Sequence, residues 1–142
     1  MQMKFMVVAA LALAFAAGYL TRGAVPGEPV AFAQGSRVFE LRTYTAADGK
    51  LDLLHARFRN HTGTFFKKHG MTPVVYGKIS DAPLSQNTMV YLLAFPSREA
   101  ATKSWAEFRA DQGWAAVAKE SGVGAVKVDS VFFEPTDYSP MK

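Results

Sequence analysis

Apolar and polar residues alternate along residues 37–45, which predicts a β-strand early in the second part of the chain. One face of this strand carries Phe39 and Leu41, an apolar pair suited to burial under helices. The other face carries an acid, a base and a phenol in a row: Glu40, Arg42 and Tyr44. Such groups are costly to bury unless they are paired or hydrated, so this face is either solvated, internally paired or part of a cavity wall.

The remaining pattern predicts two long helices, a short third helix and three further strands. Residues 50–69 follow the 3.6-residue period of an amphipathic helix, with Phe58 and Phe65 on its buried stripe and Gly70 as the residue that ends it. The second helix follows Ser97 as its N-cap, and the short helix precedes the last strand. Alternating or wholly apolar runs predict the strands: residues 71–80, 88–95 and 126–134.

The order of these elements is β-α-β-β-α-β, which predicts an α+β, ferredoxin-like fold with an antiparallel sheet. Because crossover connections are right-handed, both long helices cover the same sheet face and leave the other face open. We expect aromatic residues on the open face: Tyr44 and Tyr76, with either Met89, Tyr91 and Phe95 or their alternating neighbours. An open face of this kind indicates a dimer interface or a ligand wall, and two such sheets facing each other would form an eight-stranded barrel.

An apolar stretch at the N-terminus predicts export of the chain. Lys4 precedes an uncharged run over residues 5–20, and residues 31–33 (AFA) match the small-residue pattern of a cleavage site. We interpret residues 1–33 as a signal peptide and residues 34–142 as the exported domain, periplasmic or secreted. The alternative is an uncleaved N-terminal membrane anchor with a tether, which also places the domain outside the cytoplasm. Membrane contact is expected only in that second case.

Composition narrows the classes of protein to which the exported domain can belong. The chain has no cysteine, which excludes disulfide bonds, a thiol nucleophile and a lipoprotein anchor. Without residues 1–33 it has 14 basic and 11 acidic residues, which are scattered rather than grouped. This weak, dispersed charge gives no support for nucleic-acid binding. A domain of this size has a thin core of its own, so its many phenylalanines favour a homodimer.

Several segments, in a fixed order, carry a family resemblance: FELRTY, FFKKHG, VVYGKI, MVYLLAF and WAEFRADQGWAAV. Together they resemble the NIPSNAP family, part of the dimeric α/β-barrel superfamily, over about Val38 to Phe133. The resemblance implies a ferredoxin-like protomer that dimerises as an α/β barrel. It implies no single reaction, because the superfamily includes cofactor-free monooxygenases, haem-degrading enzymes, lactone isomerases and binding proteins.

The polar face of the first strand holds the best candidate site. Glu40 and Arg42 are two residues apart on one face, which favours a charge-assisted pair with a structural role. Arg42 could instead bind an anionic or enolate ligand, with Tyr44 as a hydrogen-bond donor. If the helices cover Phe39 and Leu41, the three polar side chains project into the barrel interior or onto the dimer interface.

Aromatic residues and histidines elsewhere could extend this site. Tyr76 and Tyr91, on neighbouring strands, would add phenolic contacts to a small apolar or aromatic ligand. His55 and His61 lie on opposite flanks of the first helix and either could reach the pocket, whereas His69 is interpreted as a last-turn cap on helix carbonyls. No two histidines share the i, i+4 geometry of a zinc pair, so no metal is expected. A haem ligand from this set stays open, but the sequence gives it no positive support, so no cofactor is expected.

The sequence lacks the motifs of nucleotide, phosphate, serine-hydrolase and zinc-protease sites, so the catalytic residues, if any, are unknown. Three hypotheses stay open. The first is an exported, homodimeric binding protein with a small apolar or aromatic ligand in its barrel. The second is a cofactor-independent monooxygenase or related enzyme, in which Arg42, Tyr44 and His55 would activate an enolisable substrate. The third is a purely structural oligomer whose sheet faces fill one another.

Overall fold

The computed structural model describes residues 37–142, and the predicted signal peptide at residues 1–33 lies outside this range. Four strands form an antiparallel sheet in the order β2-β3-β1-β4: β1 (Val38–Ala46), β2 (Thr72–Lys78), β3 (Thr88–Phe95) and β4 (Val126–Phe133). The helical segments are α2 (Leu51–Arg57), η2 (Phe58–Thr62), α3 (Gly63–Lys68), η3 (Leu84–Gln86), α4 (Arg98–Ala110) and α5 (Gln112–Glu120). This order of elements confirms the predicted α+β, ferredoxin-like fold.

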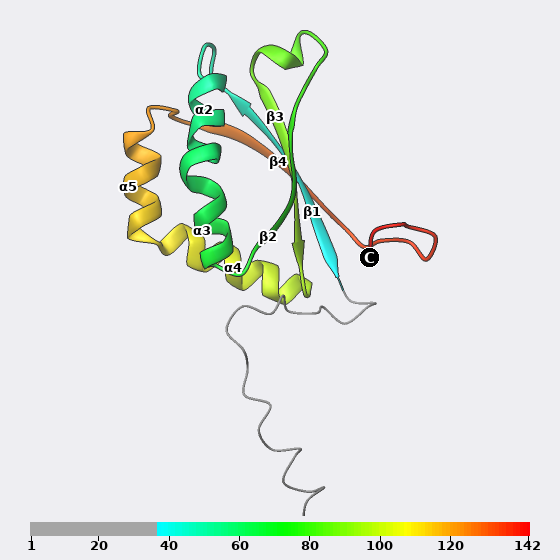
Figure 1. Cartoon of the computed structure of the whole chain (residues 1–142). Helices are drawn as coiled ribbons and strands as arrows, with labels where there is room; N and C mark the ends of the chain where they lie inside the picture. The colour runs from blue at the N-terminus through cyan, green and yellow to red at the C-terminus, as the bar shows by residue number, and fades with distance from the viewer. Residues whose placement is uncertain (1–36) are drawn as a thin grey trace, which may run out of the picture. The chain divides into compact units, whose positions relative to one another are not determined.

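The helices pack on one face of the sheet, and the core lies between these two layers (Figure 1). The central strand β3 contributes Tyr91, Leu93 and Phe95, which are fully buried. The helices contribute aromatic rings, among them Phe66 of α3 and Trp105 of α4, whose ring centres lie 5.7 Å apart. Burial of large apolar side chains of this kind supplies the main stabilising term, about 1.5–3 kcal/mol for each.

The first strand turns its polar face toward the helices, so the predicted orientation of β1 is wrong. Arg42 lies directly opposite the buried Tyr91 of β3, and opposed residues share a sheet face. Leu41 therefore points to the open face, where it is 41% exposed. The physical reason is that Glu40 finds donors on the helix side, since Trp105 Nε1 of α4 donates a 2.6 Å hydrogen bond to Glu40 Oε2. A carboxylate satisfied in this way escapes most of the cost of burial.

The open face carries side chains that the helices do not cover. Its exposed apolar members come from three strands: Leu41 of β1, Val75 of β2, and Val131 and Phe133 of β4. The predicted Tyr44 and Tyr76 are not on this face, because both pack edge-on against Phe58 of η2, at 5.9 and 5.6 Å between ring centres. On β3, the alternating neighbours of Tyr91 take the open side. The open face is therefore aliphatic for the most part, and the tyrosines belong to the covered side.

The first helix is interrupted by the π-helical turn η2. Thr62 donates a 3.2 Å hydrogen bond from Oγ1 to the carbonyl of Arg57, five residues earlier, across this widened turn. The turn rotates the residues that follow it, so Phe66 is 1% exposed while Phe65, which was predicted on the buried stripe, is only partly buried. Turns of this kind are frequent at functional sites.

Candidate functional site

A buried carboxylate organises the helix-facing side of β1. Glu40 is 1% exposed, and three side chains donate to it. Arg42 Nη1 lies 3.0 Å from Oε1, Ser130 Oγ of β4 lies 2.6 Å from the same oxygen, and Trp105 Nε1 lies 2.6 Å from Oε2. The charge-assisted pair predicted from the sequence is thus present. Donors from β4 and α4 complete it, so one carboxylate ties together three elements that are distant in sequence.

Arg42 is stacked as well as paired. The central carbon of its guanidinium lies 3.9 Å from the centre of the Trp105 ring and 5.6 Å from that of Tyr44. Its Nε atom is buried and has no hydrogen-bond partner among the described residues. The pairing with Glu40 and the stacking on Trp105 give Arg42 a structural role in this cluster.

All three candidate tyrosines, Tyr44, Tyr76 and Tyr91, pack against Phe58. Tyr91 lies 5.1 Å from both Tyr44 and Phe58, and 6.3 Å from Tyr76, measured between ring centres. Burial, with the adjacent Tyr44 as a smaller cause, raises the pKa of the Tyr91 phenol far above its ordinary value. Tyr91 therefore keeps its proton at any physiological pH. The structure brings together the aromatic candidates from β1, β2 and β3 on the helix side of the sheet, where Tyr76 on the edge strand is 43% exposed.

Arg57, which the sequence analysis did not select, is buried beside this aromatic group. It is 8% exposed, its guanidinium lies 5.3 Å from the Trp114 ring, and its Nε has no partner among the described residues. Burial lowers the pKa of Arg57, while the nearby hydroxyls of Tyr44 and Tyr91 oppose that shift. Within residues 37–142, no carboxylate pairs with it. The sequence feature that could have indicated burial of Arg57 is its spacing, because it follows Leu54 of the buried stripe by three residues.

A pocket of about 540 Å³ lies between the first helix and the edge strand β2. The helix contributes most of its lining, and the strands contribute the rest: His55, Phe58, Arg59, Gly63, Thr64, Lys67, Pro73, Tyr76 and Met89. Two of the predicted candidates, His55 and Tyr76, meet here, and the Nε2 atom of His55 is buried without a partner among the described residues. Arg42 and Tyr44 do not line the pocket. Phe58 belongs both to the pocket wall and to the tyrosine group.

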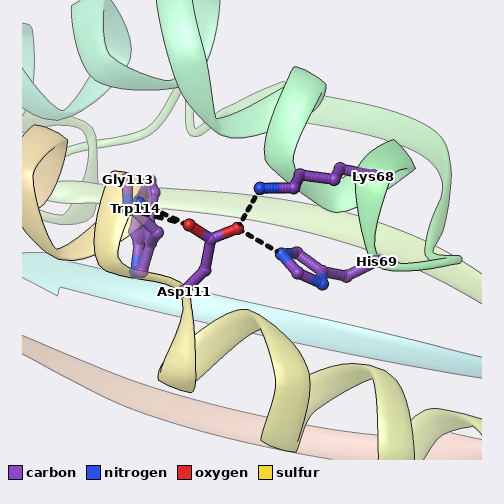
Figure 2. A network of polar contacts seen from close by, with 5 residues as sticks. All are labelled: Lys68, His69, Asp111, Gly113 and Trp114. Atoms are coloured by element: carbon purple, nitrogen blue, oxygen red, sulfur yellow. Dashed lines mark hydrogen bonds and ion pairs between the residues drawn. The ribbon is translucent and has the colours of Figure 1, made fainter.

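The other two histidines, His61 and His69, do not line the pocket. His61 is exposed on η2. His69 does not cap the helix carbonyls as predicted, because its Nε2 lies 2.7 Å from Asp111 Oδ2, and Lys68 Nζ lies 2.6 Å from the same oxygen (Figure 2). Asp111 also accepts from the backbone N–H groups of Gly113 and Trp114 as the N-cap of α5. Lys68 and then His69 hold the pKa of Asp111 well below its ordinary value, so this network fastens the end of α3 to the start of α5.

Residues 37–142 contain neither a cluster of metal ligands nor a membrane-spanning helix. No three histidine, aspartate or glutamate side chains in that range gather as metal ligands. No helix of the same range is both long and apolar enough to cross a membrane.

The fold and the order of motifs agree with a known family. The NIPSNAP family profile matches residues 39–140, almost all of the described chain. The chain belongs to the NIPSNAP family. This confirms the resemblance carried by the segments from FELRTY to WAEFRADQGWAAV. Among curated proteins, none matches the sequence.

Solved structures share this NIPSNAP fold. A NIPSNAP family protein with unknown function from Agrobacterium tumefaciens has a TM-score of 0.66 at 20% identity, over 77% of this chain and 96% of that chain. A dimeric ferredoxin-like protein from an uncultured marine organism has a TM-score of 0.54 at 11% identity, over 68% and 92%. SnoaB, a cofactor-independent oxygenase from Streptomyces nogalater, has a TM-score of 0.51 at 14% identity, over 74% and 98%. Likeness at these identities shows the fold alone.

Proposed function

We propose that this NIPSNAP protein binds a small apolar or aromatic ligand in the pocket between its first helix and β2. The pocket carries this proposal, because about 540 Å³ is within the usual range for small-molecule sites. Its wall combines apolar surface from Phe58 and Met89 with the polar groups of His55 and Tyr76. The proposed site lies between the first helix and β2, whereas the sequence analysis expected a ligand in the barrel interior.

A neutral dye, N-phenyl-1-naphthylamine, tests this proposal because its fluorescence rises in an apolar site. Gly63→Leu should abolish dye binding, since a Cβ added at Gly63 would lie 3.2 Å from Tyr76 Oη and a longer side chain would fill the pocket. Thr64→Trp blocks the pocket from an exposed position and serves if Gly63→Leu folds poorly. Ala106→Leu, on the exposed side of α4, is the matched control and should leave binding unchanged. If both pocket variants bind the dye as tightly as the wild type does, the proposal is wrong.

The open sheet face supports a second part of the proposal, a homodimer. Leu41, Val75, Val131 and Phe133 form an exposed apolar surface on three strands, which a second copy of the sheet would cover. Val131→Glu should produce a monomer in a measurement of mass in solution. Leu53→Glu alters an equally apolar but helix-borne exposed position and should leave the dimer intact. A wild-type monomer at micromolar concentration would contradict this part.

Export is the third part of the proposal, and the apolar run at residues 5–20 with the AFA pattern at residues 31–33 supports it. N-terminal sequencing of the protein from the exported fraction should begin at Gln34. A retained Met1 would support the membrane-anchored alternative.

A cofactor-independent oxygenase or related enzyme is the second candidate function. The observation in its favour is the buried Arg57 near Tyr44 and Tyr91, because an unneutralised cation stabilises an enolate. Against it, none of Arg42, Tyr44 and Arg57 lines the pocket. Exchange of the α-hydrogens of 2-tetralone with heavy water, followed by NMR, tests for enolisation, and Arg57→Gln should abolish any exchange above the buffer rate. The purely structural alternative, in which the sheet faces of two copies fill one another, gives this pocket no role.

A further inference from the structure

The pocket has basic groups at its rim and no acidic ones. Arg59 and Lys67 line it from the helix side, together with His55, and no aspartate or glutamate of residues 37–142 lines it. Neither Arg59 nor Lys67 forms an ion pair with another described residue. Lys68, the next residue along, is instead paired with Asp111. A concave site lined by one sign of charge concentrates ligands of the opposite sign.

The interior of the pocket suits the body of such a ligand. Phe58 and Met89 are 7% and 1% exposed and present an apolar wall. The hydroxyl of Tyr76 lies beside Gly63, on the pocket side of the helix. Burial raises the pKa of Tyr76, so the phenol stays protonated and is a hydrogen-bond donor. Apolar surface, one neutral donor and two free cations therefore line the same space.

We propose that the pocket selects aromatic anions, that is, small ligands with a flat apolar body and one oxyanion group such as a carboxylate or sulfonate. The body lies against Phe58 and Met89, and the oxyanion meets Arg59, Lys67 and the hydroxyl of Tyr76. This inference rests on the proposed small-molecule function and adds the charge of the ligand to it. A charge-assisted contact of this kind is stronger than a neutral one, so the anion gains affinity that a neutral analogue lacks.

Two dyes that differ by one sulfonate test the charge directly: 8-anilino-1-naphthalenesulfonate and N-phenyl-1-naphthylamine. The double variant Arg59→Gln/Lys67→Gln should weaken binding of the sulfonate by about tenfold and that of the neutral dye by less than about twofold. The control Arg109→Gln/Lys119→Gln removes two exposed cations outside the pocket and should change neither affinity. Salt should weaken binding of the sulfonate to the wild type and have a smaller effect in the double variant.

The outcomes separate this inference from the function on which it rests. In one outcome, Gly63→Leu or Thr64→Trp abolishes binding of both dyes, but the double variant binds the sulfonate as tightly as the wild type. The pocket then binds ligands but does not select anions. If the control variant weakens the sulfonate as much as the double variant does, the attraction comes from the general surface charge and the inference is wrong. If neither dye responds to the blocking variants, the proposed function itself fails.

Discussion

Two polar regions lie on the helix side of the sheet and differ in how their charges are neutralised. Around Glu40, one carboxylate meets three donors from β1, β4 and α4, so the cluster is internally satisfied. In the neighbouring pocket, Arg59 and Lys67 face the same space with no carboxylate among the described lining residues. Arg57 is buried and does not line the pocket, and it too has no carboxylate partner within residues 37–142. Satisfied groups hold a fold together. In the proposed anion site, the counter-charge that Arg59 and Lys67 lack among the described residues would come from a ligand.

The largest expected loss of stability comes from removing the Glu40 carboxylate, whose donors are all within the protein. Glu40→Ala leaves the Arg42 guanidinium, the Trp105 indole N–H and the Ser130 hydroxyl without their acceptor. We expect the free energy of unfolding to fall by about 3–5 kcal/mol, measured by urea denaturation. Glu40→Gln keeps an acceptor and should cost less than Glu40→Ala. Glu107→Gln, on the exposed side of α4, is the control and should change stability by less than about 0.5 kcal/mol.

Arg57→Met should act in the opposite direction. The substitution removes a buried cation that has no carboxylate partner within residues 37–142 and keeps a side chain of similar length against Trp114. We expect the free energy of unfolding to rise by about 1 kcal/mol in the same denaturation experiment. Arg109→Met, at an exposed position, should leave it unchanged. A loss of more than about 1 kcal/mol would show that Arg57 belongs with the structural cluster and would remove the contrast between the two regions.

A smaller effect, tied to pH, is expected at the link between α3 and α5. Asp111→Asn keeps an N-cap oxygen for α5 but loses the charge that attracts Lys68 and His69. Because the pKa of Asp111 is lowered in the folded protein, its stabilising effect is present above the ordinary value of 3.8 and is lost as the pH falls below it. The wild type should therefore melt at a higher temperature than the variant at neutral pH, and the difference should narrow below about pH 4. A difference that does not change with pH would exclude the ion pairs as its cause.

The order of elements and the family could be predicted from the sequence, because periodicity and the sequence of motifs are local properties. The orientation of β1 could not. Alternation shows that Glu40, Arg42 and Tyr44 share a face, but not which face the helices cover. That choice depends on Trp105 and Ser130, which donate to Glu40 from 65 and 90 residues away.

The candidate site could be predicted only in part, and the π-helical turn explains what was missed. His55 and Tyr76 do line a pocket, and Tyr91 and Tyr44 lie beside it. The positions after η2 depart from the 3.6-residue period, so the sequence pattern placed Phe65 rather than Phe66 on the buried stripe. The same pattern carries no sign that a cation such as Arg57 would be buried.

The smallest expected change in stability comes from removing the two cations that line the pocket. Arg59→Gln/Lys67→Gln removes two cations that pair with no other described residue and whose side chains are exposed. Substitutions at such positions change the free energy of unfolding by less than about 0.5 kcal/mol each, and mutual repulsion lost between the two charges would favour a slight gain. We therefore expect urea denaturation to match the wild type while the affinity for the anionic dye falls. A loss as large as that of Glu40→Ala would mean that these cations hold the fold, and the two regions would then differ in exposure but not in role.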